Sequence, residues 1–187
     1  RKNSETDLDI VHLKKDELVE SGLYFRPDGS PESTEFTYIR FLVPHLQNYE
    51  GWAMFVDSDF LFTYDINHLF KRVLCELDSD LKSVYVCKHP EYVPKSNKKF
   101  FGKPQLTFPK KNWSSLMLFN CAHPHAKWLT PMSVSNQTPQ WLHRFEWTTD
   151  NSLGHIPLMW NWLVGEYDGG NPIPFGIHFT NGGPFND

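Results

Sequence analysis

Short apolar runs alternate along the chain with segments whose apolar residues recur at helical spacing. The runs predict strands at 9–13, 52–56, 83–87, 115–119, 160–164 and 175–179. The spacing predicts helices from near residue 33 to Pro44 and over 65–74, and Asp150 is expected to cap a short helix over 151–155. Strands that alternate with helices favour an α/β fold, with a mainly parallel central sheet flanked by helices.

Length and composition narrow the class of protein. The chain has 187 residues, of which 40% are hydrophobic, so we expect a single domain over 1–187 with a real core. The formal net charge of -4 gives no broad attraction to nucleic acid, and we expect none as a partner. No apolar stretch has transmembrane length, and three widely spaced cysteines favour a reducing compartment. These features predict a cytoplasmic protein without a transmembrane segment.

The segment Asp57-Ser58-Asp59 follows the apolar run 52–56 and carries the strongest chemical signal. In an extended backbone, side chains two positions apart point to the same face, so Asp57 and Asp59 would present their oxygens together. Paired carboxylates suit hard cations such as Mn²⁺ or Mg²⁺, which also bind phosphate oxygens. A polar turn is the alternative, but two carboxylates inside a hydrophobic stretch are costly without a counter-charge. We therefore expect a metal site.

His178 is the second candidate ligand, at the end of the last apolar run. A packed or hydrogen-bonded histidine is the ordinary alternative. The following Asn181-Gly182-Gly183-Pro184 favours a binding role, because glycines let backbone N–H groups approach an anion closely. An imidazole beside two carboxylates would favour Mn²⁺ over Mg²⁺.

Two charged residues elsewhere have two interpretations each. Arg40 lies on the helix predicted before the strand at 52–56. It is either a surface salt-bridge partner or a clamp for phosphate or carboxylate. Asp150 is either a helix cap or a group that holds sugar hydroxyls and helps to position the reacting centre.

Four stretches carry a resemblance to a known family, and they lie at 33–44, 52–62, 111–120 and 178–185. Together they resemble the family 8-like glycosyltransferases, whose nucleotide-sugar-binding fold is called GT-A. The stretch Trp160–Gly165 is similar to one in a subgroup of uncharacterised bacterial and viral members. The resemblance implies an enzyme that moves a hexose-type sugar from a UDP-sugar donor to a hydroxyl of a glycan or saccharide acceptor. It also implies glycan biosynthesis and a Mn²⁺ held by Asp57, Asp59 and His178.

The same resemblance implies roles for further residues. The implied donor-binding residues are Arg40, Asp57, Ser58, Asp59, Ser114, Ser115, Gly182 and Gly183, and the implied catalytic residues are Asp150 and Arg40. Two departures from the family stand out. The family's first strand, which grips the uridine, would precede Arg1, so we expect the fold to lack it and the chain to be part of a larger protein. Gly183-Pro184 stands where better-known members have Lys-Pro, so backbone amides would replace that lysine's charge.

Two other classes of protein stay open. A sugar-nucleotide nucleotidyltransferase would share the sheet, but it normally shows a Gly-rich basic phosphate loop that this chain lacks. A non-catalytic glycan-binding module would explain the many aromatic residues, although most of these are expected in the core.

Overall fold

The computed structural model describes residues 8–27, 36–75, 79–90, 110–167 and 172–180. Two sheets organise these residues, one with the order β1-β4-β3-β5 and one with the order β2-β7-β6. The strands are β1 (Trp52–Val56), β2 (Phe60–Phe62), β3 (Val84–Val86), β4 (Leu116–Asn120), β5 (Leu153–His155), β6 (Trp162–Leu163) and β7 (Gly176–His178). The α-helices are α1 (Lys15–Glu20), α2 (Phe36–Ile39), α3 (Val43–Leu46), α4 (Asn67–Leu74), α5 (Pro131–Asn136) and α6 (Pro139–His143).

The larger sheet is mixed, which corrects the expectation of a mainly parallel one. Strand β4 pairs antiparallel with β1 and with β3, and only β3 and β5 pair in parallel. Strands β1, β3 and β5 thus share one direction, and β4 runs against them. Periodicity reports which face a side chain occupies, whereas strand direction depends on the path of the connecting chain. The sequence pattern therefore predicted the strands without fixing the direction of β4.

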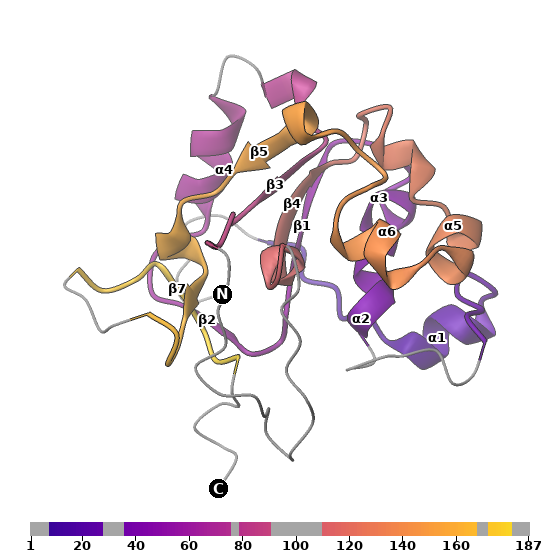
Figure 1. The fold of residues 1–187 in the computed structure, drawn as a ribbon, viewed down its shortest axis with the longest axis horizontal. Helices are drawn as coiled ribbons and strands as arrows, with labels where there is room; N and C mark the ends of the chain where they lie inside the picture. Colours follow the sequence, from indigo (N-terminus) through magenta and orange to yellow (C-terminus); the bar gives the residue numbers. More distant parts are fainter. Residues whose placement is uncertain (1–7, 28–35, 76–78, 91–109, 168–171, 181–187) are drawn as a thin grey trace, which may run out of the picture.

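Helices cover both faces of this sheet and make a three-layer α/β arrangement, as expected. In Figure 1, α4 lies on one side of the sheet, and α2, α3, α5 and α6 lie on the other. Alternate residues of β4 supply the two cores: Met117 and Phe119 pack with the α2–α3 region, whereas Leu116 and Leu118 pack with α4. All five residues of β4 are buried, which identifies it as a central strand.

One continuous helical segment precedes β1, the strand that leads to Asp57, and confirms the helix expected there. It runs through α2, the 3₁₀ turn η1 (Arg40–Leu42) and α3. Pro44 stands in the first turn of α3, where a missing backbone N–H costs little. Ser33, where the helix was expected to begin, lies outside the described residues.

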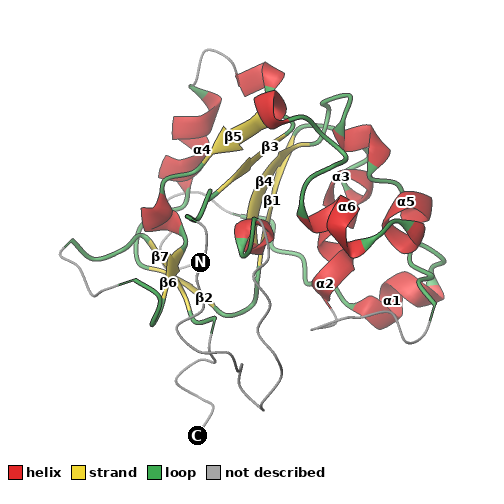
Figure 2. Ribbon diagram, viewed as in Figure 1, coloured by secondary structure: helices red, strands yellow, loops and turns green. Residues whose placement is uncertain are grey.

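The smaller sheet lies beside the end of the larger one, as Figure 2 shows. Strand β7 is central, antiparallel to β2 and parallel to β6. The chain passes from β1 in the larger sheet to β2 in the smaller sheet through Asp57, Ser58 and Asp59. The Asp-x-Asp segment is therefore the point at which the two sheets are joined along the chain.

Two expected elements are absent from their places. Residues 9–13 form no strand, and Ile10 and Val11 are exposed, because no strand in the described part of the chain pairs with them. Residues 151–155 are not a helix: the 3₁₀ turn η6 (Asp150–Ser152) leads directly into β5. Pairing with β3 overrides the local helical signal there. Among the described residues, no helix has the length and apolar character needed to cross a membrane.

Candidate metal centre

Both sheets contribute to one cluster of side chains that can hold a cation. The N–H of Asp57 donates to the carbonyl of Ser115 at 2.9 Å, which extends the β1–β4 pairing by one residue. The carbonyl of Asp59 accepts from the N–H of Phe179 at 3.0 Å, which extends the β2–β7 pairing. As a result, Asp57, Asp59 and His178 each offer one ligand atom, and these atoms all lie within 4.8 Å of one another. The convergence expected from the sequence is confirmed as geometry.

Arg40 holds Asp57 from the helical side. Its Nη2 lies 2.9 Å from Asp57 Oδ1, and its Nη1 donates to Oδ2 at 3.3 Å, so the contact is two-pronged. Two further N–H groups, on Nε and Nη1, donate to the carbonyls of Phe36 and Ser114, both at 2.9 Å. The guanidinium also lies over the Phe55 ring, 4.9 Å from its centre. With only 7% of the residue exposed, Arg40 is a buried anchor, which excludes the surface salt bridge.

Burial and neighbouring charges act together on this pair. Burial lowers the pKa of Arg40, and the carboxylates of Asp57 and Asp59 oppose that change. Burial raises the pKa of Asp57; Arg40 and His178 oppose the rise, and Asp59 adds to it. Two carboxylates and one guanidinium carry a formal charge of -1. A divalent cation would therefore relieve the repulsion between the carboxylates and make the cluster positive.

A chain of buried hydrogen bonds fixes the orientation and tautomer of His178. Ser115 Oγ donates to the carbonyl of Asn112 at 2.7 Å, so it accepts from Asn161 Nδ2 at 2.8 Å. The amide oxygen of Asn161 then faces His178 Nδ1 at 3.0 Å and accepts its proton. The lone pair of His178 Nε2 is thereby directed at the carboxylates. A hydrogen-bonded imidazole with its second nitrogen free is the usual arrangement of a metal-binding histidine.

Among the residues that the structure describes, the inner oxygen of Asp59 has no hydrogen-bond partner. Asp59 Oδ1 is buried and lies 3.2 Å from His178 Nε2, but this close approach does not have hydrogen-bond geometry. An Nε2 lone pair that faces a carboxylate oxygen at this distance needs a positive charge between them, which a metal ion or a proton on Nε2 would supply. Ligands at right angles around a small octahedral cation with bonds of about 2.1 Å lie about 3 Å apart. The donor set, and the spacing of this one pair, therefore fit a divalent cation.

Ser114 and Ser115, expected to bind the donor, are both buried in the wall behind the carboxylates. The hydroxyl of Ser114 lies 2.9 Å from His143 Nδ1, and its carbonyl accepts from Arg40. The ring of His143 packs at an angle against Tyr38 and edge-on against Phe41. In these contacts both serines brace Arg40 and Asn161, and their contact with a donor stays a prediction.

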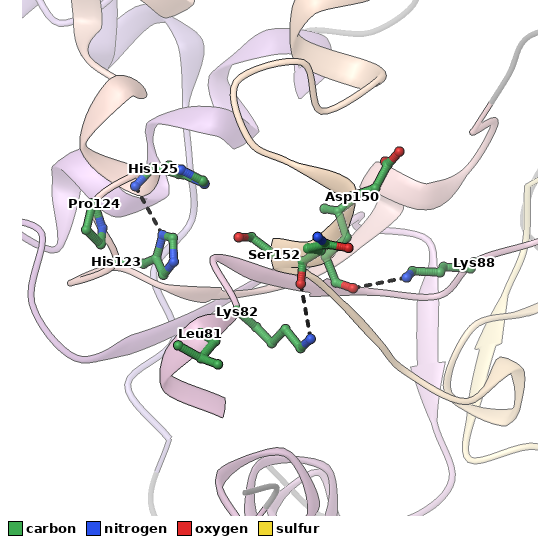
Figure 3. Close-up of a pocket in the computed structure, with 10 residues that line it drawn as sticks. Leu81, Lys82, Lys88, His123, Pro124, His125, Asp150 and Ser152 are labelled. Atoms are coloured by element: carbon green, nitrogen blue, oxygen red, sulfur yellow. Dashed lines mark hydrogen bonds between the residues drawn. The ribbon is translucent and has the colours of Figure 1, made fainter. Parts of the chain in front are cut away.

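Asp150 lies away from this cluster. Strands β1 and β5 run in the same direction; Asp57 follows the end of β1, whereas Asp150 precedes the start of β5. Its carboxylate is 88% exposed and pairs with Lys110 at 3.0 Å. It borders a surface pocket shown in Figure 3, lined by Leu81, Lys82, Lys88, His123, Pro124, His125, Asp150, Asn151, Ser152 and Leu153. The structure does not bring Asp150 to the metal centre, and its catalytic role stays a prediction.

The other expected donor-binding residues divide between exposed and undescribed positions. Ser58 is exposed between the two carboxylates, with its backbone in the turn that joins the sheets. Gly182 and Gly183 lie outside the described residues. Their expected contacts with a donor therefore stay predictions.

Asn161 is the member of the cluster that sequence reasoning did not assign. It is fully buried and connects His178 to the larger sheet through Ser115. The sequence does contain a feature that could have pointed to Asn161, since it is a polar residue between Trp160 and Trp162 in an otherwise apolar run. A buried amide in such a run needs partners, which marks it as a residue that orients another group.

Comparison with solved structures defines the class of fold. The chain is similar to the crystal structure of mouse xyloside xylosyltransferase 1 in its apo form, with a TM-score of 0.54 over 89% of this chain and 71% of that one. The sequence identity is 13%, so the likeness concerns the fold. The mixed α/β architecture is that of a GT-A glycosyltransferase, as the sequence resemblance implied.

Comparison with known sequences gives the family. No family model matches the chain. The chain is 43% identical over 191 residues to Protein CDI of Arabidopsis thaliana, a match that covers 100% of this chain and 71% of that protein. The chain belongs to the Protein CDI family. Membership of glycosyltransferase family 8 stays a prediction.

Proposed function

We propose that this protein is a glycosyltransferase that depends on a divalent cation, uses a UDP-sugar as donor and transfers a hexose-type sugar to a hydroxyl of a glycan or saccharide. One observation carries the proposal: Asp57, Asp59 and His178 converge on a common position, and within the described residues the inner oxygen of Asp59 lacks a hydrogen-bond partner there. The GT-A fold supports the proposal, because it makes such a cluster a natural place for a nucleotide diphosphate. The imidazole ligand favours Mn²⁺ over Mg²⁺.

The residues of the cluster would have distinct tasks. Asp57 and Asp59 supply oxygen ligands, and His178 supplies a nitrogen whose direction Asn161 sets. Arg40 keeps the Asp57 carboxylate in place and charged, since its two-pronged contact opposes the effect of burial. In this arrangement Arg40 positions Asp57, and its expected catalytic and donor-binding roles stay predictions.

When bound, the cation would stabilise the negative charge that develops on the UDP leaving group. The protein's own contribution is to hold ligands and donor in fixed positions before the reaction begins, so that little reorganisation is required. The 38% exposure of the Asp59 side chain leaves the outer side of the cluster open to a ligand. Gly182, Gly183 and Ser58 are proposed to contact the diphosphate, and the catalytic role expected of Asp150 stays a prediction.

Replacement of Asp59 tests the proposal most simply. In a thermal-shift assay, UDP with Mn²⁺ should stabilise the wild-type protein, because a ligand that binds only the folded state raises its stability, by about 2.7 kcal/mol at a hundred times Kd. Asp59→Ala should remove the Mn²⁺-dependent part of this shift and the metal-dependent release of UDP. The fold should survive, since the side chain is partly exposed.

Asp9→Ala is the matched control, because it removes an exposed carboxylate far along the chain from the cluster. This variant should keep the full shift. A full Mn²⁺-dependent shift in Asp59→Ala would refute the metal assignment. Stabilisation by free saccharides, with no response to UDP, would instead identify a glycan-binding module.

A further inference from the structure

A second polar pair, His89 and Tyr167, lies beside the candidate metal centre. His89 follows the end of β3, and Asp57 follows the end of β1; these two strands share one direction, so both residues lie at the same edge of the larger sheet. Tyr167 follows β6, a neighbour of the strand that carries His178. The Tyr167 hydroxyl and His89 Nδ1 are 2.6 Å apart, so this bond connects the two sheets at the site.

His89 is close to the metal centre without being one of its ligands. Burial and, to a smaller extent, the nearby His178 together lower the pKa of His89 to about 4, so the ring is neutral at pH 7. The group of atoms within 4.8 Å of one another comprises Asp57, Asp59 and His178 and does not include His89. The ring could therefore contact a ligand bound next to the cation, rather than the cation itself.

The hydroxyl of Tyr167 determines which nitrogen of His89 carries the proton. Burial raises the pKa of Tyr167 to about 12, so the phenol keeps its proton at neutral pH. Within the described structure His89 Nδ1 is its hydrogen-bond partner, so the O–H donates to Nδ1. The ring proton is then on Nε2, where it forms an N–H donor.

This donor is buried and unsatisfied in the described structure. Only 6% of His89 is exposed, and its Nε2 has no hydrogen-bond partner. A buried N–H without a partner is destabilising, so such groups are rare and call for an explanation. The backbone of His89 is also held, because Trp113 Nε1 donates to its carbonyl at 3.1 Å and its N–H donates to the carbonyl of Cys87 at 3.0 Å. The ring itself stacks on Tyr167, with the ring centres 6.0 Å apart. A rigid, unpaired donor is what a binding site has before its ligand arrives.

Building on the proposed function, we propose that His89 Nε2–H donates a hydrogen bond to an oxygen of the sugar nucleotide bound at the cation. Tyr167 is the positioning residue that fixes the tautomer. The sugar nucleotide is rich in acceptor oxygens, on both its diphosphate and its sugar, and a neutral N–H donor suits them. The cost of the unpaired donor in the free protein would be recovered when the donor substrate binds.

The test compares nucleotide affinity with stability in His89→Phe and His89→Gln. Calorimetric titration with Mn²⁺ and a panel of UDP, UDP-glucose, UDP-galactose and UDP-xylose first identifies which compound the wild-type protein binds best. His89→Phe should bind that compound about 10-fold or more weakly, because a hydrogen bond to a substrate oxygen is lost. Its Tm should be unchanged or higher, since the unpaired N–H is removed. His89→Gln, whose amide can place an N–H near the Nε2 position, should recover part of the affinity.

Tyr167→Phe and His12→Phe complete the design. Tyr167→Phe should weaken binding by a smaller factor, because His89 remains but its tautomer is no longer fixed. His12 is exposed, and its replacement should leave affinity unchanged. Affinity in His89→Phe within two-fold of wild type, or an equal fall in Tm for Phe and Gln without loss of affinity, would overturn the proposal. If the wild-type protein binds none of the panel, the proposed function itself fails.

Discussion

Arg40 shows how one residue serves both the scaffold and the candidate site. Its donors are distributed between two backbone carbonyls and both oxygens of Asp57. A lysine has a single charged nitrogen and cannot reproduce this planar arrangement. Loss of one partner from a buried ion pair typically costs about 3–5 kcal/mol, because the other charge is left uncompensated. Arg40 is therefore as much a folding residue as a site residue.

His143, which supports Ser114 behind Arg40, should make stability depend on pH. Burial, followed by the charge of Arg40, lowers the pKa of His143 to about 3 from an ordinary value of 6.5. Between these values the unfolded chain binds more protons than the folded one, so stability falls as the pH falls. This residue alone should account for a loss of about 2 kcal/mol between pH 7 and pH 5.

Urea unfolding at pH 7 and pH 5 measures this contribution. His143→Phe keeps a ring against Tyr38 and Phe41 but removes the titrating group. The difference in unfolding free energy between the two pH values should shrink by about 2 kcal/mol in this variant. His12→Phe should leave the difference as in wild type. An unchanged pH dependence in His143→Phe would show that the ring is not held neutral by its surroundings.

At the scale of elements, the pairing of β2 with β7 brings Asp59 to His178. Register places Phe60 opposite His178, and the two rings stack with their centres 4.3 Å apart. Gly176 opens β7, and a Cβ at this position would collide with the carbonyl oxygen of Trp160. Strand β7 can therefore keep its position only with glycine here.

Gly176→Ala and Gly154→Ala separate strain near the site from strain elsewhere. A Cβ at Gly154, in β5, would collide with the ring of Tyr85. Each change should lower the free energy of unfolding by about 1–3 kcal/mol, measured by urea denaturation. Only Gly176→Ala should also weaken Mn²⁺-dependent binding of UDP, because it displaces β7 and with it His178. Equal affinity in the two variants would argue against a metal centre that depends on the position of β7.

Helix and strand positions could be predicted where local pattern and tertiary context agree. The strands at 52–56 and 84–86 and the helix at 67–74 have apolar faces that the fold buries. The predictions for 9–13 and 151–155 were wrong for one physical reason. Pairing partners, rather than local propensity, decide whether a short segment becomes a strand. The convergence of Asp57, Asp59 and His178 could be predicted, because carboxylate and imidazole side chains are typical metal ligands.

At the scale of the whole molecule, the candidate site lies where two sheets and a helical layer meet. The larger sheet contributes Asp57, the smaller sheet contributes Asp59 and His178, and the helical segment contributes Arg40. Asn161 and His89 escaped assignment, because their partners Ser115 and Tyr167 are distant in sequence and only folding brings them together. The sequence therefore predicted the three side chains that converge, but not the polar contacts that orient them.

The most direct test is the position of the ion itself. Crystals grown with Mn²⁺ and UDP would give an anomalous scattering peak for manganese. We expect one peak in contact with Asp57, Asp59 and His178 Nε2, at distances of about 2.1 Å, with UDP oxygens completing the shell. Bound UDP with no manganese at these three residues, or manganese bound elsewhere, would contradict the account.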